Sequence, residues 1–192
     1  YFDGRILEGR TEIDPRMISA YRHLIHDPAI SPSLKAELFS FPSDSLLAQR
    51  YDVLDPETIL SAKSELITAL SHSLRQDWKT LFDSVPASSG LTSLDFGRRK
   101  LQRCALFFWS KTEDPQAHAL ISELAISSPF MSLRLFGLQV LCDQDSSFKN
   151  EALEKYRNDW EHESLVMNKW FAIQATSEHP STFENVMRLT QH

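Results

Sequence analysis

The chain has 192 residues, of which 42% are hydrophobic and 24% are charged, an ordinary composition for a globular protein with a sizeable core. Only 5 residues are glycine, which is low against a usual share of about 7% and argues against a turn-rich all-β fold. The net charge of -6 makes broad attraction to nucleic-acid phosphates or anionic lipid unexpected. No apolar run approaches the ~18 residues of a membrane span, so we expect neither nucleic acid nor a membrane as a partner.

Three residue pairs predict helix starts in the first third of the chain. Each pair places a side chain that can accept a hydrogen bond directly before a proline at the first helical position: Asp14-Pro15, Ser31-Pro32 and Asp55-Pro56. The helix from Ser31 is expected to break at Phe41-Pro42. Ser43 is expected to begin another short helix that runs to about Arg50.

A long amphipathic helix is predicted from Asp55 to about Asp83. Its apolar residues recur at steps of three and four, which is the spacing of one helix face: Ile59, Leu60, Ile67, Leu70, Leu74, Trp78, Leu81 and Phe82. A loop follows at residues 86–90, and the next helix is expected over residues 95–111.

Beyond residue 112 the predicted helices follow one another with short breaks. They are expected over residues 115–127, 129–142, 147–160, 163–177 and 181–190. Ser181 and Glu184 fit a capping box, in which each side chain satisfies the backbone N–H of the other residue. No run alternates apolar and polar residues convincingly, so no sheet is predicted.

The lengths of these helices and loops indicate the fold class. Consecutive helices of ~10–15 residues with loops of about 2–6 residues are typical of antiparallel neighbours. Stacked helix pairs of this kind bury each other's apolar faces in a solenoid. Because the pairs show no tight sequence period, we predict an all-α fold of stacked antiparallel helix pairs that form an irregular armadillo-like or HEAT-like superhelix.

The stretch from Lys155 to Ala175 holds two of the four tryptophans. Trp160 is predicted near the end of one helix, and Trp170 lies next to Phe171 on the following helix. The two indoles can therefore meet across an antiparallel turn and bury apolar surface there. We take Trp160, Trp170 and Phe171 as candidates for core or interface residues.

A short basic run goes against the net charge of the chain. It comprises Arg98, Arg99, Lys100 and Arg103, and Arg99 and Arg103 are four residues apart, so they share a helix face. No aromatic-basic interleaving of an RNA-binding type accompanies the run. We therefore expect Arg99 and Arg103 to face solvent or the acidic groups of a partner.

Motifs of metal-dependent hydrolysis are incomplete in this sequence. His162-Glu163 begins like the zinc motif H-E-x-x-H, but Val166 takes the place of the second histidine. His23 and His26 are three residues apart without an evident acidic third ligand nearby, so a surface pair is expected. We predict no metal site and no cofactor within this chain.

Residues of nucleophilic and acid–base catalysis also lack partners. Cys104 and Cys142 lie on the apolar faces of predicted helices, which favours buried and unreactive thiols. Acidic residues crowd the range 151–163, and a charge run of this kind is typical of a solvated helix face. The sequence thus predicts no catalytic and no substrate-binding residue in this chain.

Three stretches resemble the bacterial aminopeptidase N (alanyl aminopeptidase) family. The most specific lies within residues 159–177, around Val166-Met167-Asn168-Lys169-Trp170-Phe171. The second is Asp52-Val53-Leu54-Asp55-Pro56, and the third runs from Arg98 through Phe107. The likeness extends from about residue 10 to residue 192. Within it, Asn168 stands where an acidic residue is expected.

The resemblance implies that the chain is part of the C-terminal helical domain of a four-domain zinc exopeptidase. In this family the metal ligands and the general base lie in an upstream thermolysin-like domain. The helical domain caps the catalytic cavity and restricts access to short peptides. The implied partners are thus the upstream catalytic domain of the same chain and the peptide substrates, and zinc belongs to the parent protein.

Residues 1–12 are polar and lack clear periodicity, so we expect a linker or the end of a preceding helix there. The resemblance implies that residues 13–192 are part of a single C-terminal helical domain, truncated at its C-terminal end. The chain begins at Tyr1 without a methionine, which indicates a segment of a longer protein. Two cysteines imply no disulfide framework, so we expect a reducing, cytoplasmic location.

Two functions follow from these observations. The first is a non-catalytic cap that shields the active-site cavity of a zinc-dependent aminopeptidase, which would itself be a hydrolase. The alternative is an independent helical-repeat module for protein–protein interaction. A free-standing enzyme has little support, because no catalytic set is complete.

Overall fold

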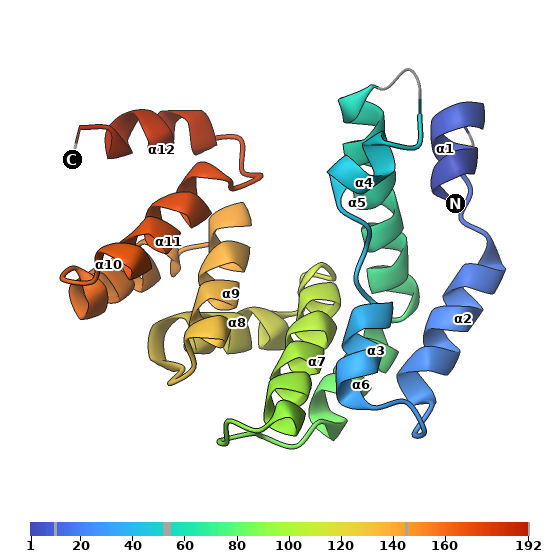
Figure 1. Ribbon diagram of the computed structural model, residues 1–192, viewed down its shortest axis with the longest axis horizontal. Coiled ribbons are helices and arrows are strands. Elements are labelled where there is room, and N and C mark those ends of the chain that lie inside the picture. Colours follow the sequence, from blue (N-terminus) through green and yellow to red (C-terminus); the bar gives the residue numbers. More distant parts are fainter. Residues whose placement is uncertain (10, 52–54, 145, 192) are drawn as a thin grey trace. The chain divides into compact units, whose positions relative to one another are not determined.

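The computed structural model describes residues 1–9, 11–51, 55–144 and 146–191. These residues form helices, turns and loops and no strand, which confirms the predicted all-α class (Figure 1). The helices are α1 (Phe2–Glu8), α2 (Pro15–His26), α3 (Pro32–Leu38), α4 (Asp44–Ala48), α5 (Pro56–Ser73), α6 (Arg75–Ser84), α7 (Ser93–Ser110), α8 (Pro115–Ser127), α9 (Met131–Asp143), α10 (Lys149–Trp160), α11 (Ser164–Ala175) and α12 (Thr182–Leu189).

The helices group into two compact units, Tyr1–Asp114 and Pro115–His192. Helices α1 to α7 belong to the first unit and α8 to α12 to the second. The assignment of residues 13–192 to one domain stays a prediction. In the part of the chain that the structure describes, no helix combines the length and the apolar character needed to pass through a bilayer.

The three predicted proline starts are confirmed, since α2, α3 and α5 each begin at the proline. Asp14, Ser31 and Asp55 each accept a hydrogen bond from a backbone N–H two or three residues ahead, at 2.8, 3.4 and 3.1 Å. These acceptors satisfy N–H groups that a helix start leaves without an intrahelical partner.

The single helix predicted over residues 55–83 is wrong, because the chain breaks at Leu74 between α5 and α6. Leu74 has φ -120° and ψ 22°, which is outside α-helical geometry. Beyond the break, the Trp78 indole N–H reaches back and donates to the Leu70 carbonyl oxygen at 3.0 Å. The apolar spacing continues through Leu74, so the spacing alone does not reveal the break.

The helices predicted beyond residue 112 are present, and their ends lie within two residues of the predicted ones. The capping box predicted at Ser181 is wrong: Ser181 precedes α12, but its side chain makes no capping hydrogen bond. Its Oγ lies 2.8 Å from Nδ1 of His179 and accepts a hydrogen bond from the Asn185 amide at 3.3 Å. A capping box does occur at Thr92 and Asp95, where α7 begins earlier than predicted.

The first residues form a helix that is attached to the first unit. In α1, Arg5 donates two hydrogen bonds, of 2.8 and 2.9 Å, to the carboxylate of Glu65 on α5. Gly9 ends α1 with φ 66°, a left-handed conformation that favours glycine. Of the stretch from Asp52 to Pro56 that resembles the aminopeptidase N family, residues 52–54 lie outside the described residues.

Buried aromatic rings form the centre of the first unit. The Trp78 indole on α6 stacks on the Phe108 ring of α7, with centroids 4.3 Å apart and planes 9° apart. Phe39, which follows α3, meets Trp78 edge-on at a centroid distance of 5.0 Å. Each of these side chains is at most 2% exposed. Because aromatic pairs stabilise beyond the area they bury, this cluster fixes α6, α7 and the end of α3 against one another.

Two helices of the second unit approach each other backbone to backbone. A Cβ atom added to Gly137 on α9 would lie 2.7 Å from the backbone nitrogen of Ala125 and 2.8 Å from the backbone oxygen of Ile121, both on α8. Such distances are too short for a carbon atom, so α8 and α9 can pack this closely only because residue 137 is glycine.

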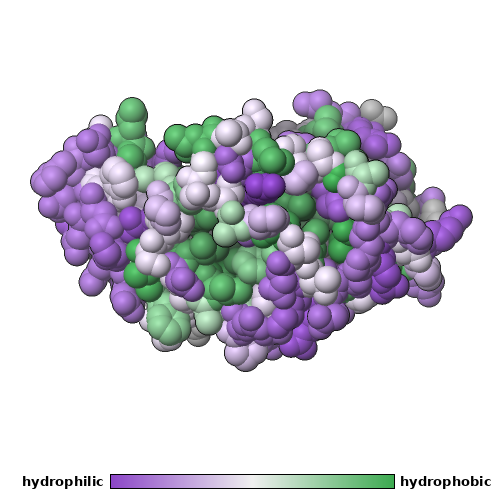
Figure 2. Space-filling model, turned by 90° about the horizontal axis from the view of Figure 1, so that it is seen from below, coloured by the Kyte–Doolittle hydropathy of each residue, from purple (hydrophilic) through white to green (hydrophobic). Residues whose placement is uncertain are grey.

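Large apolar side chains also remain at the surface. Leu91, Leu165 and Phe183 are 74%, 78% and 76% exposed, and Figure 2 shows hydrophobic residues beside hydrophilic ones on one face of the molecule. Scattered exposed apolar residues are normal in proteins. Exposure alone therefore marks no site, and a candidate site needs a pocket and polar groups as well.

Candidate functional site

A groove in the second unit contains Trp170 and Phe171, two of the candidates from the sequence. It lies where α10 passes into α11 and has a volume of about 700 Å³, within the range of ~300–1,000 Å³ typical of ligand pockets. We call it the Trp170 groove; its lining residues are Arg157, Glu161, His162, Ser164, Met167, Asn168, Trp170 and Phe171. The groove thus combines aromatic, amide and charged side chains.

Trp170 is the anchor of this groove. Its side chain is buried, and its indole N–H donates to the Leu153 carbonyl oxygen on α10 at 2.9 Å. The Phe171 ring meets the Trp170 ring edge-on, with centroids 4.9 Å apart, and is 39% exposed. Trp170 therefore holds α11 to α10, while Phe171 presents an apolar ring at the surface.

The predicted contact between the Trp160 and Trp170 rings is not among the ring contacts of the described residues. Trp170 contacts Phe171 instead. Trp160 is half-buried at the end of α10. Its indole N–H is enclosed and has no hydrogen-bond partner in the described part of the chain. Trp160 is therefore partly enclosed at the end of α10, and no ring contact between it and Trp170 is among those of the described residues.

A smaller pocket of about 360 Å³ adjoins this groove and extends to α12. Trp170 and Arg157 line both cavities. Arg157 was not singled out in the sequence, although it follows Leu153 by four residues and therefore shares its helix face. The other residues of this pocket are Asn150, Leu153, Glu154, Gln174, Asn185, Arg188 and Leu189.

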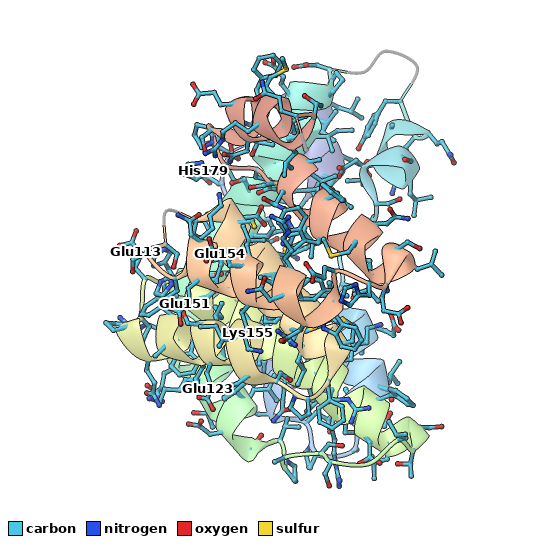
Figure 3. All side chains as sticks on the ribbon, turned by 90° about the vertical axis from the view of Figure 1, so that its left-hand side faces the viewer. Glu113, Glu123, Glu151, Glu154, Lys155 and His179 are labelled. Carbon is cyan, nitrogen blue, oxygen red and sulfur yellow. The ribbon has the colours of Figure 1, made fainter. Side chains whose placement is uncertain are left out.

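The acidic residues of α10 divide into a solvated group and one residue that makes a structural contact. Glu151 and Glu154 are exposed and lie along α10 with Lys155 in Figure 3. Asp159 instead accepts hydrogen bonds from Lys155 and from Arg134 on α9, the latter at 2.8 Å. These hydrogen bonds hold the pKa of Asp159 below its ordinary value, so this carboxylate is an ionised structural group and is unsuited to donate a proton.

The expectation that Arg99 faces solvent is wrong. Arg99 is 3% exposed, and its guanidinium donates to the Gly90 carbonyl oxygen at 2.8 Å and lies 4.8 Å from the centre of the Phe96 ring. Arg99 therefore ties the loop before α7 to the helix. Arg103 is half-buried one turn later, and Lys100 pairs with Glu37 on α3, so the basic run is largely engaged within the first unit.

Within the described residues, the two thiols and the pair His23 and His26 lie in structural surroundings. Burial raises the pKa of Cys142 to about 11 and also raises that of Cys104, which keeps both thiols protonated and unreactive at neutral pH. His23 and His26 are exposed, and His26 Nε2 lies 2.6 Å from Asp77 on α6. In the residues that the structure describes, no three His, Cys, Asp or Glu side chains gather as metal ligands.

Comparison with known proteins places this chain in a family. A family model described as a domain of unknown function (DUF3458_C) with ARM repeats matches residues 4–192. The chain is 28% identical to aminopeptidase N of Escherichia coli over 174 residues, which are 90% of this chain and 20% of that protein. It is 29% identical to aminopeptidase N of Caulobacter vibrioides over 184 residues, 93% of this chain and 21% of that protein.

A solved structure supports the fold. The crystal structure of Legionella pneumophila aminopeptidase A in complex with aspartic acid matches with a TM-score of 0.83 at 22% identity, over 94% of this chain and 22% of that chain. The chain thus spans about a fifth of the length of these relatives. The resemblance to the aminopeptidase N family is confirmed, and the chain belongs to the DUF3458_C family of ARM-repeat domains.

Proposed function

We propose that this chain is the C-terminal helical cap of a zinc-dependent aminopeptidase that removes N-terminal residues from peptides. The observation that carries the proposal is the match of at least nine-tenths of the chain to about a fifth of two aminopeptidases N. In this proposal the chain is non-catalytic. It shields the cavity of an upstream catalytic domain and restricts access to short peptides.

The zinc ion would be bound outside this chain. The described residues bring together no trio of His, Cys, Asp or Glu side chains, and zinc sites need three or four such ligands. The residues present therefore do not fit a zinc site, and no catalytic step is assigned to them.

The proposal is tested on the longer protein that would contain this chain. Its upstream sequence should hold H-E-x-x-H with a distal glutamate, and the absence of that motif would refute the proposal. Activity is then measured on an alanyl amide and on peptides of increasing length, with and without residues 1–192. Loss of the cap should raise the rate on long peptides relative to the small amide, whereas equal changes for all substrates would contradict a role in access.

An independent protein-interaction module is the second candidate. The exposed Phe171 ring beside Trp170 favours it, because aromatic side chains are enriched at protein interfaces. A reading frame that begins near Tyr1, together with a stable protein partner that is lost on Phe171→Ala, would support this second function over the first.

We further propose a cytoplasmic location. Cys104 and Cys142 are both unpaired, as expected in a reducing compartment. Cell fractionation with an antibody against the chain tests this location, and recovery from a secreted or periplasmic fraction would refute it.

A further inference from the structure

Helix α1 lies at the edge of the first unit, beside α5 (Figure 1). It has 7 residues, and none of them is buried. A helix shorter than about 12–15 residues is marginally stable by itself in water, so α1 depends on contacts with the rest of the unit. Phe2 and Ile6 are half-buried, which limits the apolar part of these contacts. The polar contacts of α1 therefore carry weight in its attachment.

Two carboxylates attach α1 to neighbouring elements. Glu65 on α5 accepts two hydrogen bonds from the Arg5 guanidinium, at 2.9 and 2.8 Å. Asp3 on α1 accepts one hydrogen bond from Arg50 at 3.0 Å and one from the Tyr51 hydroxyl at 2.7 Å. Bidentate arginine–carboxylate pairs are the stronger kind of ion pair. The pair of Arg5 with Glu65 is thus the main polar link between α1 and α5.

Both ion pairs of α1 are open to solvent. The side chains of Arg5 and Glu65 are 18% and 37% exposed, and those of Arg50 and Asp3 are 59% and 55% exposed. Dissolved ions screen exposed charges, because the Debye length falls from about 10 Å at 0.1 M salt to about 3 Å at 1 M. The attachment of α1 should therefore weaken as the ionic strength rises.

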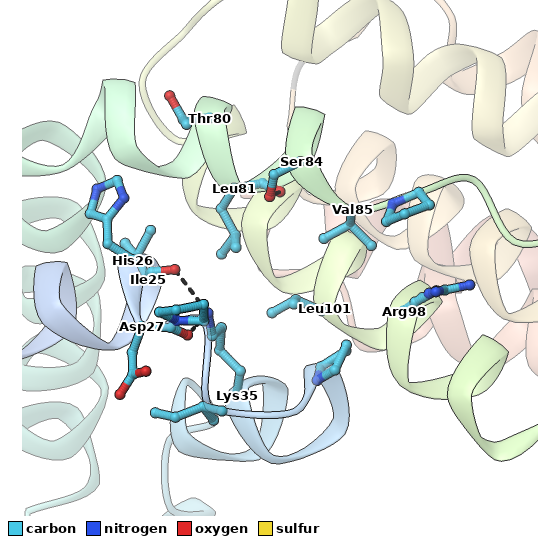
Figure 4. A pocket seen from close by; sticks show the side chains of 14 residues that line it. Ile25, His26, Asp27, Lys35, Thr80, Leu81, Ser84, Val85, Arg98 and Leu101 are labelled. Carbon is cyan, nitrogen blue, oxygen red and sulfur yellow. Dashed lines mark hydrogen bonds between the residues drawn. The ribbon is translucent and has the colours of Figure 1, made fainter.

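The cation that holds the end of α2 is placed differently. Lys35 on α3 is only 7% exposed and lines a pocket of about 380 Å³ (Figure 4). Its ammonium group donates to the carbonyl oxygens of Ile25 and Asp27, each at 2.9 Å. Buried charges are screened much less than exposed ones. The contact of α3 with the end of α2 should therefore resist salt, in contrast to the attachment of α1.

Gly9 ends α1 at a point where the chain can change direction. It has φ 66°, and glycine adopts this left-handed conformation and right-handed ones at similar cost. A Cβ atom added to Gly9 would meet no atom within 4 Å, so neighbouring groups leave space around this residue. The geometry at Gly9 is thus compatible with a movement of α1 away from α5.

We propose that residues Phe2–Glu8 form a detachable strap, which the Arg5–Glu65 and Asp3–Arg50 ion pairs hold against the first unit and which can leave while the rest of the unit stays folded. The aromatic cluster of α6, α7 and Phe39 includes no residue of α1, so release of the strap leaves that cluster intact. On release, Glu65 and Arg50 lose these partners and become available to charged groups of another molecule. The strap therefore controls access to one anionic and one cationic side chain.

Hydrogen exchange of the ¹⁵N-labelled 192-residue chain, followed by NMR, measures the opening of the strap. The amides of Arg5 and Gly9 report on it, because both donate to backbone oxygens within this segment. The amides of Leu74 and Trp78 report on α5 and α6. Between about 0.1 M and about 1 M sodium chloride, we expect exchange of the strap amides to become roughly tenfold faster. The amides of α5 and α6 should keep their exchange rates.

Matched variants separate the ion pair from the general charge of the unit. Glu65→Gln and Arg5→Gln should each speed exchange of the strap amides roughly tenfold at low salt, because each removes the charge-assisted pair from one side. Glu57→Gln makes the same chemical change in the first turn of the same helix and should leave these rates unchanged. Arg5 lies on the strap itself, so its variant stays informative even if Glu65→Gln disturbs the folding of α5.

Three results would overturn the proposal. The first is strap exchange that responds neither to salt nor to Arg5→Gln. The second is an equal acceleration in Arg5→Gln and Glu57→Gln, which would show that the charge of the whole unit matters and the pair does not. The third is a parallel acceleration of the α5 and α6 amides, which would show that α1 opens only when the unit unfolds. None of these outcomes bears on the proposed role as an aminopeptidase cap.

Discussion

Arg134 and Asp159 form an ion pair of 2.8 Å that joins α9 to α10. The Arg134 side chain is only 9% exposed and also donates to the Ala125 carbonyl oxygen at 3.3 Å. Its guanidinium lies 5.5 Å from the centre of the Tyr156 ring. One arginine thus connects α8, α9 and α10, and Asp159 supplies the charge that balances it.

Asp159→Asn should lower the free energy of unfolding by about 1–3 kcal/mol, because it leaves a largely buried guanidinium without its counter-charge. The comparison is Lys155→Ala, which removes the exposed partner of the same carboxylate and should cost no more than about 0.5 kcal/mol. Urea unfolding of both variants measures the difference. Equal costs would mean that Arg134 finds another partner or water.

Asp95 should titrate far below an ordinary aspartate. Hydrogen bonds from Ser88 and Thr92 lower its pKa to about 2, and its carboxylate completes the capping box of α7. Because the folded state has the lower pKa, the contribution of Asp95 to stability is present above the unfolded value of about 3.9 and is lost as the pH falls through about 2. NMR titration should show a higher pKa of Asp95 in Ser88→Ala, and an unchanged value would exclude the Ser88 hydrogen bond.

Trp170→Ala should destabilise the second unit by roughly 3–5 kcal/mol, because it removes a buried indole and the hydrogen bond to Leu153. Phe171→Ala is the matched control, since its ring is exposed by more than a third, and it should cost less than about half as much. Thermal unfolding by circular dichroism compares the two. An unchanged melting temperature for Trp170→Ala would place that side chain at the surface.

Glu113→Gly should stabilise the first unit. Glu113 follows α7 with φ 57°, a left-handed conformation that costs about 1–2 kcal/mol for residues with a Cβ atom, partly offset by the greater freedom of glycine in the unfolded chain. Glu123→Gly, in the interior of α8, should instead destabilise by about 1 kcal/mol. Both glutamates are labelled in Figure 3. The same sign for the two variants in denaturant unfolding would contradict the strain at Glu113.

Local signals in the sequence predicted most helix starts and missed features that depend on distant residues. The side chains at Asp14, Ser31 and Asp55 act within three residues, so their roles as helix caps are visible in the sequence. The break at Leu74 is accompanied by contacts of Trp78 with the Leu70 carbonyl and with the distant Phe108 ring, and helical spacing carries no information about those contacts.

The candidate sites show the same difference between signals that are local in the sequence and contacts with distant residues. The stretch around Trp170 was predicted as a core or interface region because it holds two of the four tryptophans and resembles a known family, and the structure places a groove there. The prediction that Arg99 faces solvent failed because Arg99 binds the carbonyl oxygen of Gly90. That residue is nine positions away in the chain, beyond the reach of helix spacing. The sequence did not reveal that Lys35 is buried, since a lysine in a short polar helix is ordinarily exposed. Its burial depends on the carbonyl groups at the end of α2.

The contact of α8 with α9 at Gly137 sets a limit on how this unit can vary. With a hydrogen atom as the only spacer, the two backbones are in direct contact, and the atoms that a methyl group would meet belong to the backbone, which cannot move aside as a flexible side chain can. Any replacement at residue 137 must therefore push the helix axes apart, and an enlarged gap would expose the interior on both sides. The separation of these two helices is thus determined by the smallest residue in the chain.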